Sequence, residues 1–268
     1  MIEYKNIVLT GGSSGIGKAI LQRLAGGRGN RILVACRSAD SISGFGPDVI
    51  PFSCDLSSQA GVDALFDKIS EVFSNVDIFI SNAGAPYYER FDYVDWGRIS
   101  HIFDLNTVSH IYIYSKYLNY LNGRKGHLVY TISAMSEMAL PGYALYAASK
   151  FAMKGFQEAV RAEGHKNLKL TCVYPVSTNT NFFKVGGNGV KMDKPFPVQE
   201  SEQVADAVVK GIERGRKHIY PCRIFKPSKV LMTVVPPVKQ AYFASEKIKL
   251  KRFEKRAKAA GKQEGSRF

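Results

Sequence analysis

Residues 6–17 read NIVLTGGSSGIG, a short apolar run followed at once by a glycine-rich turn. The run predicts a buried strand, and the spacing of apolar residues over 16–25 predicts a helix that begins where the glycines end. Glycines between a strand and a helix let the backbone approach a pyrophosphate, whose charge is stabilised by free amides at the helix N-terminus. The turn therefore predicts a dinucleotide site formed by Gly11, Ser13, Ser14, Gly15, Ile16 and Gly17.

This turn differs from two well-known phosphate-binding patterns. It does not follow the usual dinucleotide sequence G-x-G-x-x-G, and it lacks the Gly-Lys-Ser/Thr ending of a nucleotide triphosphatase loop. Glycines also serve ordinary tight turns, and that alternative stays open for the stretch taken alone. Its place after a strand and before a helix favours the dinucleotide site.

The rest of the chain repeats the alternation of strand and helix. Further strands are predicted over 31–36, 49–53, 77–81, 127–133 and 168–174, and helices over 62–73, 96–121, 143–163 and 202–214. Alternation of this kind is typical of parallel strands joined by right-handed crossovers. We therefore expect an α/β fold, a doubly wound, Rossmann-like parallel sheet with flanking helices, in a single domain with a C-terminal extension. Residues 38–48 are too few for a crossover helix, so a turn or one helical turn is expected there.

The composition is typical of a globular protein. Of the 268 residues, 45% are hydrophobic, which is enough for a large core. No apolar run is long enough to span a membrane, and the N-terminal segment does not resemble a secretory signal. The cysteines at 36, 54, 172 and 222 form no C-x-x-C pair, and the five histidines form no H-E-x-x-H motif. We therefore expect reduced thiols, a cytoplasmic location and no metal site.

The formal net charge is +14, and half of it lies near the C-terminus. Residues 247–268 carry nine Lys or Arg against Glu254 and Glu264, a net charge of +7. The rest of the chain is only mildly basic, and it shows neither a basic face interleaved with aromatics nor a recognisable nucleic-acid-binding module. We therefore expect no nucleic-acid partner.

A second chemical feature combines Ser133, Tyr146 and Lys150. Positions 146 and 150 are one turn apart on the predicted helix, so their side chains project from the same face. A phenol with a pKa of about 10 is a poor acid–base catalyst near neutrality, and a neighbouring ammonium lowers that pKa. Ser133, at the end of a predicted strand, is placed to hydrogen-bond a reacting oxygen. For an isolated Tyr-x-x-x-Lys, the alternative is a surface pair on an amphipathic helix.

Taken in order, the motifs of this chain resemble those of the short-chain dehydrogenase/reductase family. They are Thr10-Gly-x-x-x-Gly-x-Gly17, Asn82-Ala83-Gly84, Asn106, Ser133, Tyr146-Ala-Ala-Ser-Lys150 and Tyr174-Pro175 through Thr180. Their spacing is also similar to that of the family, and together they cover about residues 5–215. The resemblance implies a nicotinamide-dependent enzyme that reduces a carbonyl or oxidises an alcohol. We also expect a homodimer or homotetramer.

The resemblance implies a role for each of these residues. Tyr146 is the general acid in reduction, and Lys150 binds the nicotinamide ribose and lowers the pKa of the tyrosine. Ser133 positions the carbonyl, and Asn106 holds a water that feeds a proton relay through Lys150. Cofactor contacts are implied for Asp55 and Leu56 at the adenine, for Asn82, Ala83 and Gly84 beside the cofactor, and for Pro175 and Thr180 near the nicotinamide. Val176 stands where the family often has glycine, which puts the local backbone in doubt. Outside Ser133, Tyr146 and Lys150, a cap or turn role is the alternative.

The choice of cofactor depends on the end of the second predicted strand. An acidic residue there accepts both ribose hydroxyls and repels a 2′-phosphate, which selects NAD. This chain has Cys36-Arg37-Ser38 instead. Arg37 matches the position that meets the 2′-phosphate in NADP-preferring members, where a guanidinium suits bidentate binding, and Ser38 can add a hydrogen bond. We therefore expect NADP(H), with an ordinary solvated arginine as the alternative.

The substrate is predicted from the apolar residues around the site. In the family, the segment after Pro175 closes over the substrate, and here that segment contains Phe182, Phe183, Val185, Met192 and Phe196. Tyr87, Tyr88 and Phe91 are candidates for the opposite wall. Aromatic walls favour a hydrophobic ketone or secondary alcohol over a small polar sugar. Ordinary packing is the alternative for these residues.

Residues 1–222 are predicted to form the dinucleotide-binding and catalytic domain, and 223–268 an extension that is first apolar and then basic. Pro227, Pro236 and Pro237 are expected to break any long helix between residues 224 and 243, and a helix is expected over 246–262. We expect the extension to dock the enzyme on an anionic membrane surface without crossing it, through apolar residues that include Phe225, Leu250 and Phe253. Packing on the body or on a sister subunit is the alternative.

Two functions of other classes remain open. The chain could be a catalytically silent protein that binds NADPH as a regulatory signal, although the complete Ser133, Tyr146 and Lys150 set argues against this. It could also be a membrane-surface or nucleic-acid-binding module that depends on its basic C-terminal residues.

Overall fold

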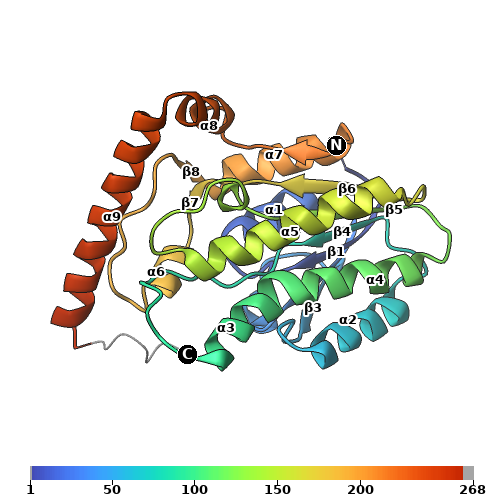
Figure 1. Ribbon diagram of the computed structural model, residues 1–268. Helices are drawn as coiled ribbons and strands as arrows, with labels where there is room; N and C mark the ends of the chain where they lie inside the picture. Colours follow the sequence, from blue (N-terminus) through green and yellow to red (C-terminus); the bar gives the residue numbers. More distant parts are fainter. Residues whose placement is uncertain (1, 262–268) are drawn as a thin grey trace.

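The structure, a computed structural model, describes residues 2–261 and is built around one parallel sheet (Figure 1). Seven strands lie in the order β3-β2-β1-β4-β5-β6-β9, and every neighbouring pair is parallel. The strands are β1 (Asn6–Thr10), β2 (Arg31–Cys36), β3 (Val49–Ser53), β4 (Ile78–Ser81), β5 (Gly126–Thr131), β6 (Leu168–Val173) and β9 (His218–Ile219). The order reverses between β1 and β4, and in open α/β sheets ligands bind at the carboxyl ends of the strands at such a switch point.

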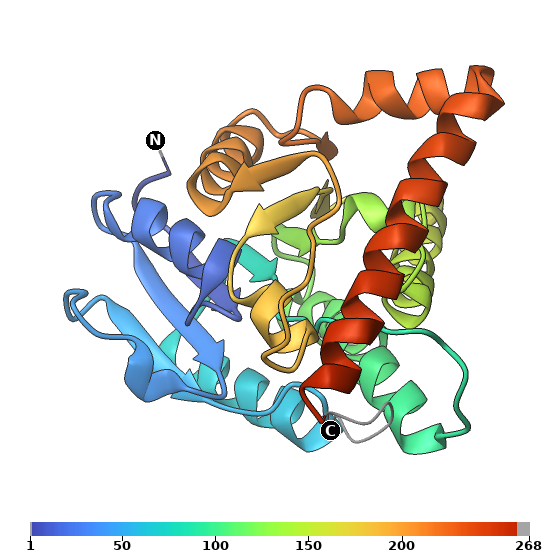
Figure 2. The ribbon, with the colours of Figure 1, turned by 90° about the vertical axis from the view of Figure 1, so that its left-hand side faces the viewer.

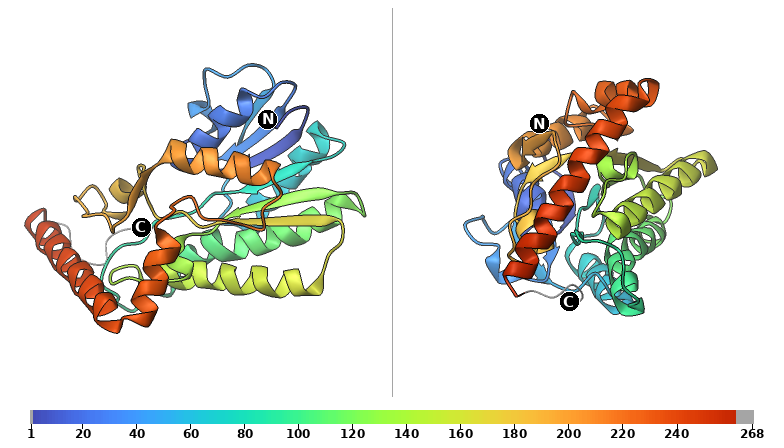
Figure 3. Two further views of the ribbon diagram at one scale, coloured as in Figure 1. Left: turned by 90° about the horizontal axis from the view of Figure 1, so that it is seen from above. Right: turned by 60° about the vertical axis from the view of Figure 1, so that its left-hand side comes forward.

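Helices cover both faces of the sheet, which makes it doubly wound (Figure 1; left view of Figure 3). One face packs against α2 (Gln59–Val72), α4 (Ser109–Leu121) and α5 (Ala144–Glu163). The other face packs against α1 (Gly15–Ala25) and α7 (Ser201–Glu213). Successive strand residues alternate between the two cores, as the pleat requires: Val8 joins the first core, whereas Ile7 and Leu9 join the second. The predicted α/β fold is confirmed.

The segment over 96–121 is helical, as predicted, but it is not one regular helix. It consists of α3 (Trp96–Phe103), a π-helical turn η2 (Asp104–Val108) and α4. π-helical turns inside helices occur often at functional sites, and this one contains Asn106. Residues 38–48 contain only the short 3-10 helix η1 (Ala39–Ser41), in agreement with the predicted turn.

Four small elements were not anticipated. Besides β9, they are β7 (Ser177–Asn179), β8 (Val198–Glu200) and α6 (Phe182–Gly186). Strands β7 and β8 pair with each other in a separate two-stranded sheet. A further 3-10 helix, η3 (Ala134–Ser136), follows β5.

The C-terminal extension forms two helices, α8 (Phe225–Val234) and α9 (Pro236–Ala259), that meet at a sharp corner (Figure 2). The expectation that prolines break any long helix between residues 224 and 243 is confirmed in part: the helical segment is interrupted at Val235, directly before Pro236 and Pro237, but Pro227 does not interrupt α8, and a long helix begins at Pro236. Pro227 lies in the first turn of α8, and Pro236 and Pro237 open α9, where the missing amide hydrogens have no helical partner to lose. The helix predicted over 246–262 is therefore longer at its N-terminal side, and Lys262 lies outside the described residues.

Candidate active site

The glycine-rich turn after β1 is tied to the loop after β4 by hydrogen bonds. The hydroxyl oxygen of Thr10 accepts bonds from the backbone amides of Asn82 (2.9 Å) and Ala83 (3.0 Å). The side-chain amide of Asn82 donates in turn to the carbonyls of Thr10 (3.2 Å) and Gly11 (3.3 Å). The two loops at the switch point are thus one rigid unit, and Asn82 is a brace between them.

Two glycines in the turn allow a close approach of backbone segments. A Cβ on Gly17 would lie 2.0 Å from the carbonyl oxygen of Gly11, so only glycine fits there. Gly15 has a φ of +53°, and a Cβ there would lie 2.9 Å from Cγ2 of Thr180. Ser14 is the N-cap of α1, whose first turn contains no acidic residue. The amides at this helix end are therefore not neutralised by a local carboxylate, which suits a phosphate.

The end of β2 lies beside the same turn. The amide of Gly11 donates a hydrogen bond to the carbonyl of Ala35 (2.8 Å). Burial raises the pKa of the Cys36 thiol, and a hydrogen bond with Ser13 opposes that shift only in part. Arg37 and Ser38 follow with exposed side chains. No carboxylate occupies positions 36–38, where an acidic residue would bind the hydroxyls of an NAD ribose.

Asp55 and Leu56 follow β3, the strand that pairs with β2, and β2 ends just before Arg37. Hydrogen bonds from the amide and hydroxyl of Ser57 hold the pKa of Asp55 below its ordinary value, and the charge of Arg37 acts in the same direction. Asp55 is exposed, whereas the Leu56 side chain is buried in the core. Leu56 can therefore face a ligand only through its backbone.

Asn106 is fully buried, and its side chain hydrogen-bonds the backbone of the loop after β4. Its side-chain oxygen accepts from the amide of Ala85 (2.7 Å), and its nitrogen donates to the Ala85 carbonyl (3.0 Å). Gly84 lies between Asn106 and Lys150, because a Cβ on it would be 3.1 Å from the Asn106 oxygen and 3.7 Å from Lys150 Nζ. The structure thus brings Asn106, Gly84 and Lys150 together.

Ser133, Tyr146 and Lys150 also come together. The side chain of Ser133 hydrogen-bonds the phenol of Tyr146, and Lys150 Nζ lies 5.8 Å from the centroid of that ring. Lys150 is buried and donates to the carbonyl of Thr131 (3.4 Å). Burial lowers its pKa to about 8. A half-buried phenol that lines the cavity beside an ammonium can exchange a proton with a bound oxygen.

The pKa of Tyr146 differs from the sequence prediction. Burial raises it to about 12, and the hydrogen bond with Ser133 opposes that shift only in part. The expectation that Lys150 holds this pKa below the ordinary value of a phenol is therefore not met. The phenol is therefore protonated near neutral pH, which is the state that a general acid requires.

An apolar cavity opens next to Ser133 and Tyr146. Its empty volume is about 790 Å³, including the part that opens to solvent. Three segments far apart in the sequence form its walls: the region 131–146, the region 175–197 and the C-terminal helices. Pro175, Thr180 and Ile16 border it on the side of the glycine-rich turn.

Comparison with known proteins identifies the family. The short chain dehydrogenase model matches residues 5–188, more than half of the chain. The chain belongs to the short-chain dehydrogenase/reductase family. It is 27% identical over 230 residues to 17-beta-hydroxysteroid dehydrogenase 13 of Mus musculus, which covers 82% of this chain and 74% of the relative.

Solved structures of short-chain dehydrogenases share the fold. A Burkholderia cenocepacia short chain dehydrogenase in complex with NADP is 22% identical, with a TM-score of 0.75 over 90% of this chain and 98% of the other. A Burkholderia phymatum short chain dehydrogenase/reductase in complex with NAD is 20% identical, with a TM-score of 0.72 over 89% of this chain and 97% of the other. At these identities the likeness concerns the fold, and this chain is placed in a family of oxidoreductases by its sequence match.

One polar residue behind the site of this short-chain dehydrogenase was not anticipated. His110 lies in α4, four residues after Asn106, and is buried. Its ring nitrogens contact the hydroxyl of Ser81 (2.6 Å) and the carbonyl of Ala83 (3.0 Å). Burial, assisted by the charge of Lys150, lowers its pKa to about 3. The ring is therefore neutral near pH 7, and its contacts hold the loop after β4 in place. The sequence feature that could have pointed to His110 is its position one helical turn after Asn106.

The cavity walls of this short-chain dehydrogenase agree only in part with the sequence prediction. Phe182, Phe183 and Phe196 line the cavity, as expected, whereas Val185 and Met192 do not. The predicted opposite wall is wrong: Tyr87, Tyr88 and Phe91 do not line this cavity. The Tyr87 hydroxyl contacts that of Tyr93 (3.0 Å), the ring of Tyr88 packs between Tyr143 and Phe253, and Phe91 is exposed.

The remaining wall comes from residues that sequence reasoning missed. Tyr143, Phe225 and Tyr242 line the cavity, and the last two belong to α8 and α9. The hydroxyl of Tyr242 donates to the carbonyl of Phe196 (2.7 Å), which joins the C-terminal extension to the segment after Pro175. The extension of this short-chain dehydrogenase is thus part of its cavity.

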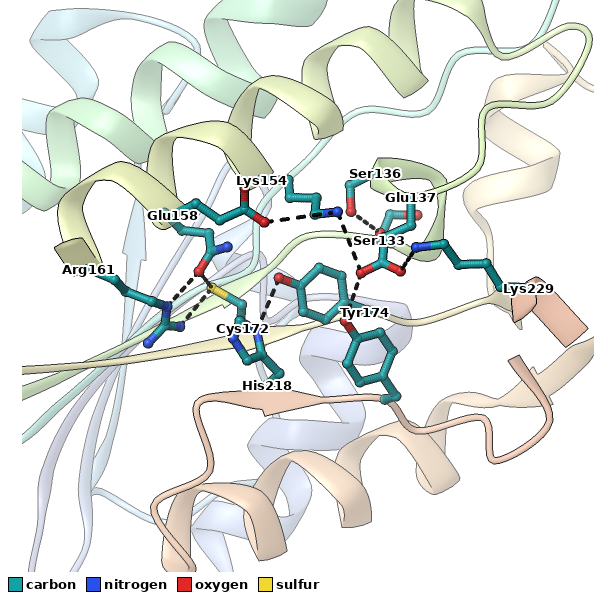
Figure 4. A network of polar contacts seen from close by, with 12 residues as sticks. Ser133, Ser136, Glu137, Lys154, Glu158, Arg161, Cys172, Tyr174, His218 and Lys229 are labelled. Carbon is teal, nitrogen blue, oxygen red and sulfur yellow. Dashed lines mark hydrogen bonds and ion pairs between the residues drawn. The ribbon is translucent and has the colours of Figure 1, made fainter. Parts of the chain in front are cut away.

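A buried acidic residue links the extension to the segment that carries Ser133 (Figure 4). Glu137 accepts hydrogen bonds from Lys229 of α8 (2.6 Å) and from the Tyr220 hydroxyl (2.7 Å), and Lys154 of α5 lies 3.9 Å away. Burial raises the pKa of Glu137, but these partners outweigh it and hold the pKa below its ordinary value. The carboxylate therefore fixes α8 against the end of β5.

Within residues 2–261, no three His, Cys, Asp or Glu side chains gather as ligands for a metal ion. The four cysteines are free. In the same range, no helix has both the length and the apolar character that a membrane span requires.

Proposed function

We propose that this chain is an NADP(H)-dependent oxidoreductase that interconverts a hydrophobic ketone and a secondary alcohol. The main support for the proposal is that Ser133, Tyr146 and Lys150 lie close together at one end of an apolar cavity that borders the glycine-rich turn. The cofactor, when bound, supplies or accepts the hydride.

Three side chains perform the proton chemistry. Ser133 orients the substrate oxygen, and the protonated phenol of Tyr146 donates to that oxygen during reduction. Lys150, with a pKa of about 8, holds a proton and a positive charge beside the phenol at neutral pH. Asn106 holds a water that passes a proton to Lys150, and Gly84 leaves the space between them open.

The residues that would hold the cofactor follow the carboxyl ends of the strands. Its pyrophosphate would be held by Gly11, Ser13, Ser14, Gly15, Ile16 and Gly17. Arg37 and Ser38 would bind the 2′-phosphate, Asp55 and the Leu56 backbone would border the adenine, and Asn82, Ala83 and Gly84 would border the middle of the molecule. Tyr146, Lys150, Pro175 and Thr180 would hold the nicotinamide ribose and carboxamide. The glycine cradle and the absence of a carboxylate over 36–38 support this fit; among related structures, one holds NADP and another holds NAD.

The cavity supports the proposal of a hydrophobic substrate. Its walls are mostly apolar or aromatic side chains, while Ser133 and Tyr146 supply polar groups near the reacting end. Burial of an apolar body together with one oriented oxygen selects a ketone or secondary alcohol with large apolar substituents. The name of the mouse relative, a hydroxysteroid dehydrogenase, agrees with such a substrate.

The proposal has three further parts. Residues 1–222 form the dinucleotide-binding and catalytic unit, and 223–268 an extension of it. The protein is a homodimer or homotetramer of the cytoplasm, and it attaches peripherally to an anionic membrane surface. The competing hypothesis of a catalytically silent NADPH-binding protein predicts cofactor binding without turnover of any ketone.

The variant Tyr146→Phe tests the proposal. Loss of the donating hydroxyl should lower kcat for ketone reduction by about 10²–10⁴-fold, while NADPH still binds. Tyr112→Phe, which removes a hydroxyl bonded to Asp63 far from the site, is the matched control and should keep full activity. A panel of aliphatic, aromatic, steroid and long-chain ketones, followed by NADPH absorbance, supplies the substrate. Near-normal turnover by purified Tyr146→Phe would exclude the mechanism.

A further inference from the structure

Helix α9 has two sharply different faces. Its inner face packs on the body through Leu250, Phe253 and Ala257, which join a cluster with Tyr88, Tyr143 and Phe183. Ion pairs reinforce the contact: Glu254 with Arg90 (2.8 Å) and Arg256 with Asp193 (3.2 Å). The prediction that Phe225, Leu250 and Phe253 contact a membrane is therefore wrong, because all three are buried in the body.

The outer face of α9 is a basic stripe, which we define as Lys247, Lys251, Arg252, Lys255 and Lys258. Lys247, Lys251, Lys255 and Lys258 are three or four residues apart and Arg252 is next to Lys251, so the five lie on one side of the helix, and all five are exposed. Within the described part of the chain, none of them forms a salt bridge. The two acidic residues of the helix are already engaged elsewhere, Glu246 with Lys249 and Glu254 with Arg90.

An apolar corner stands at the N-terminal end of this stripe, where α8 meets α9. We define it as Val230, Leu231, Val234, Val235 and Val238, whose exposed fractions are 61, 51, 73, 37 and 36%. Figure 2 and the left view of Figure 3 show this corner projecting away from the sheet. A contiguous group of exposed aliphatic side chains marks an interaction surface more often than scattered ones do.

We propose that the apolar corner and the basic stripe together form a docking surface for an anionic lipid bilayer. The aliphatic side chains enter the headgroup boundary, and the cations lie along the negatively charged surface beside it. The two features are contiguous on α8 and α9, so one placement of the bilayer can satisfy both.

Two other occupants fit less well. In a twofold dimer that pairs α9 with α9, the basic stripe of one copy would face that of the other, and unscreened like charges repel. A nucleic acid would match the stripe but not the corner, which offers branched aliphatic chains without aromatic stacking groups or hydrogen-bond donors.

This surface also has a place in the proposed function, on which its biological role rests. Phe225 lies at the start of α8 and Tyr242 in α9, and both line the apolar cavity. The corner between these helices is therefore next to the cavity walls, so that docking would bring the cavity close to the membrane. A hydrophobic ketone dissolved in the bilayer could then reach the cavity with little exposure to water.

Vesicle flotation tests the docking surface without cofactor or ketone, so its result does not depend on catalysis. The full-length protein should float with phosphatidylcholine vesicles that contain about 30% phosphatidylserine at about 0.1 M salt, and float less at about 1 M salt. The triple variant Lys251→Glu, Arg252→Glu, Lys255→Glu should bind at least tenfold more weakly. Its control, Lys125→Glu, Lys166→Glu, Lys169→Glu, makes the same change in net charge among exposed lysines at the amino ends of β5 and β6, and should bind like the wild type.

A second pair of variants tests the corner. Val234→Asp should lower binding to the same vesicles at least tenfold, whereas Val94→Asp, at another fully exposed valine, should not. The proposal is overturned if the wild type stays unbound at low salt, or if the two lysine triple variants lose binding equally. It is also overturned if sedimentation shows an oligomer that Val234→Asp dissociates while no vesicle binding occurs, or if only duplex DNA is bound. Turnover of a small soluble ketone by each variant, measured separately, reports on the proposed function alone.

Discussion

Gly17→Ala gives a sharp test of the dinucleotide cradle, because the same substitution at another helical glycine has the opposite expected effect. A Cβ at position 17 would lie 2.0 Å from the Gly11 oxygen, whereas ordinary contacts begin near 3.4 Å, so α1 and the turn must separate by about 1.4 Å. Overpacking of this kind costs about 1–3 kcal/mol, and the better helix propensity of alanine returns at most about 1 kcal/mol. At Gly155 in α5, nothing lies within 4 Å of the added Cβ, so Gly155→Ala should gain about 0.5–1 kcal/mol.

Thermal unfolding with and without NADPH measures both effects. For a domain of this size, 1 kcal/mol corresponds to roughly 2–4 °C, so Tm should fall by several degrees in Gly17→Ala and rise by about 1–4 °C in Gly155→Ala. Saturating NADPH at about 100 times Kd should stabilise the wild type and Gly155→Ala by about 2.7 kcal/mol. Gly17→Ala should lose most of that increase, because its turn no longer fits the pyrophosphate. Equal Tm values and equal NADPH stabilisation for the two variants would refute the cradle.

Three further predictions follow from charged groups. Arg37→Asp should weaken NADPH far more than NADH in fluorescence titrations, since a carboxylate repels the 2′-phosphate; equal losses would show that Arg37 does not bind it. The kcat/KM for ketone reduction should fall as pH rises through about 8, where Lys150 loses its proton, and Lys150→Arg should move that inflection to higher pH. Glu137→Gln should lower the free energy of unfolding by about 1–3 kcal/mol at pH 7 by removing the pair with Lys229. Folding lowers the pKa of Glu137, so the carboxylate stabilises the folded protein at pH values above its unfolded pKa of about 4.3. This stabilisation is lost as the pH falls through the folded pKa. The free energies of unfolding of the wild type and Glu137→Gln, measured in urea, should therefore become equal in acid.

The central sheet could be predicted because its strands are buried on both faces. Strands such as β2 and β4 are nearly continuous apolar runs, and such runs between turn signals are strong signals of parallel strands. β7 and β9 carry little of that signal. β7 is Ser-Thr-Asn and β9 has only two residues, and both are held by neighbours far along the chain.

The reacting end of the site could also be predicted, because its geometry is local. Tyr146 and Lys150 share a helix face, and Ser133 follows the strand beside that helix. Their spacing in the sequence is therefore enough to predict that the three side chains lie close together. The cavity wall to which α8 and α9 contribute could not be predicted. Tyr242 comes to Phe196 only after α8 and α9 have folded back on the body, and no local pattern distinguishes its ring from those of Tyr87 or Tyr88. The pKa of Tyr146 was also beyond sequence reasoning, because burial raises it and the hydrogen bond with Ser133 opposes that shift only in part.

The same packing decides how the C-terminal extension must be studied. Removal of α9 would uncover Tyr88, Tyr143 and Phe183, break the pair between Arg90 and Glu254, and open the cavity at Tyr242. A truncated protein would therefore expose a new apolar surface, and it would bind vesicles for a reason unrelated to the basic stripe. Loss of activity in such a protein would be equally ambiguous, since it removes a cavity wall together with the docking surface. Only substitutions on the outer face of α9 and at the exposed corner separate attachment to a membrane from the architecture of the site, because those side chains contribute to the first and not to the second.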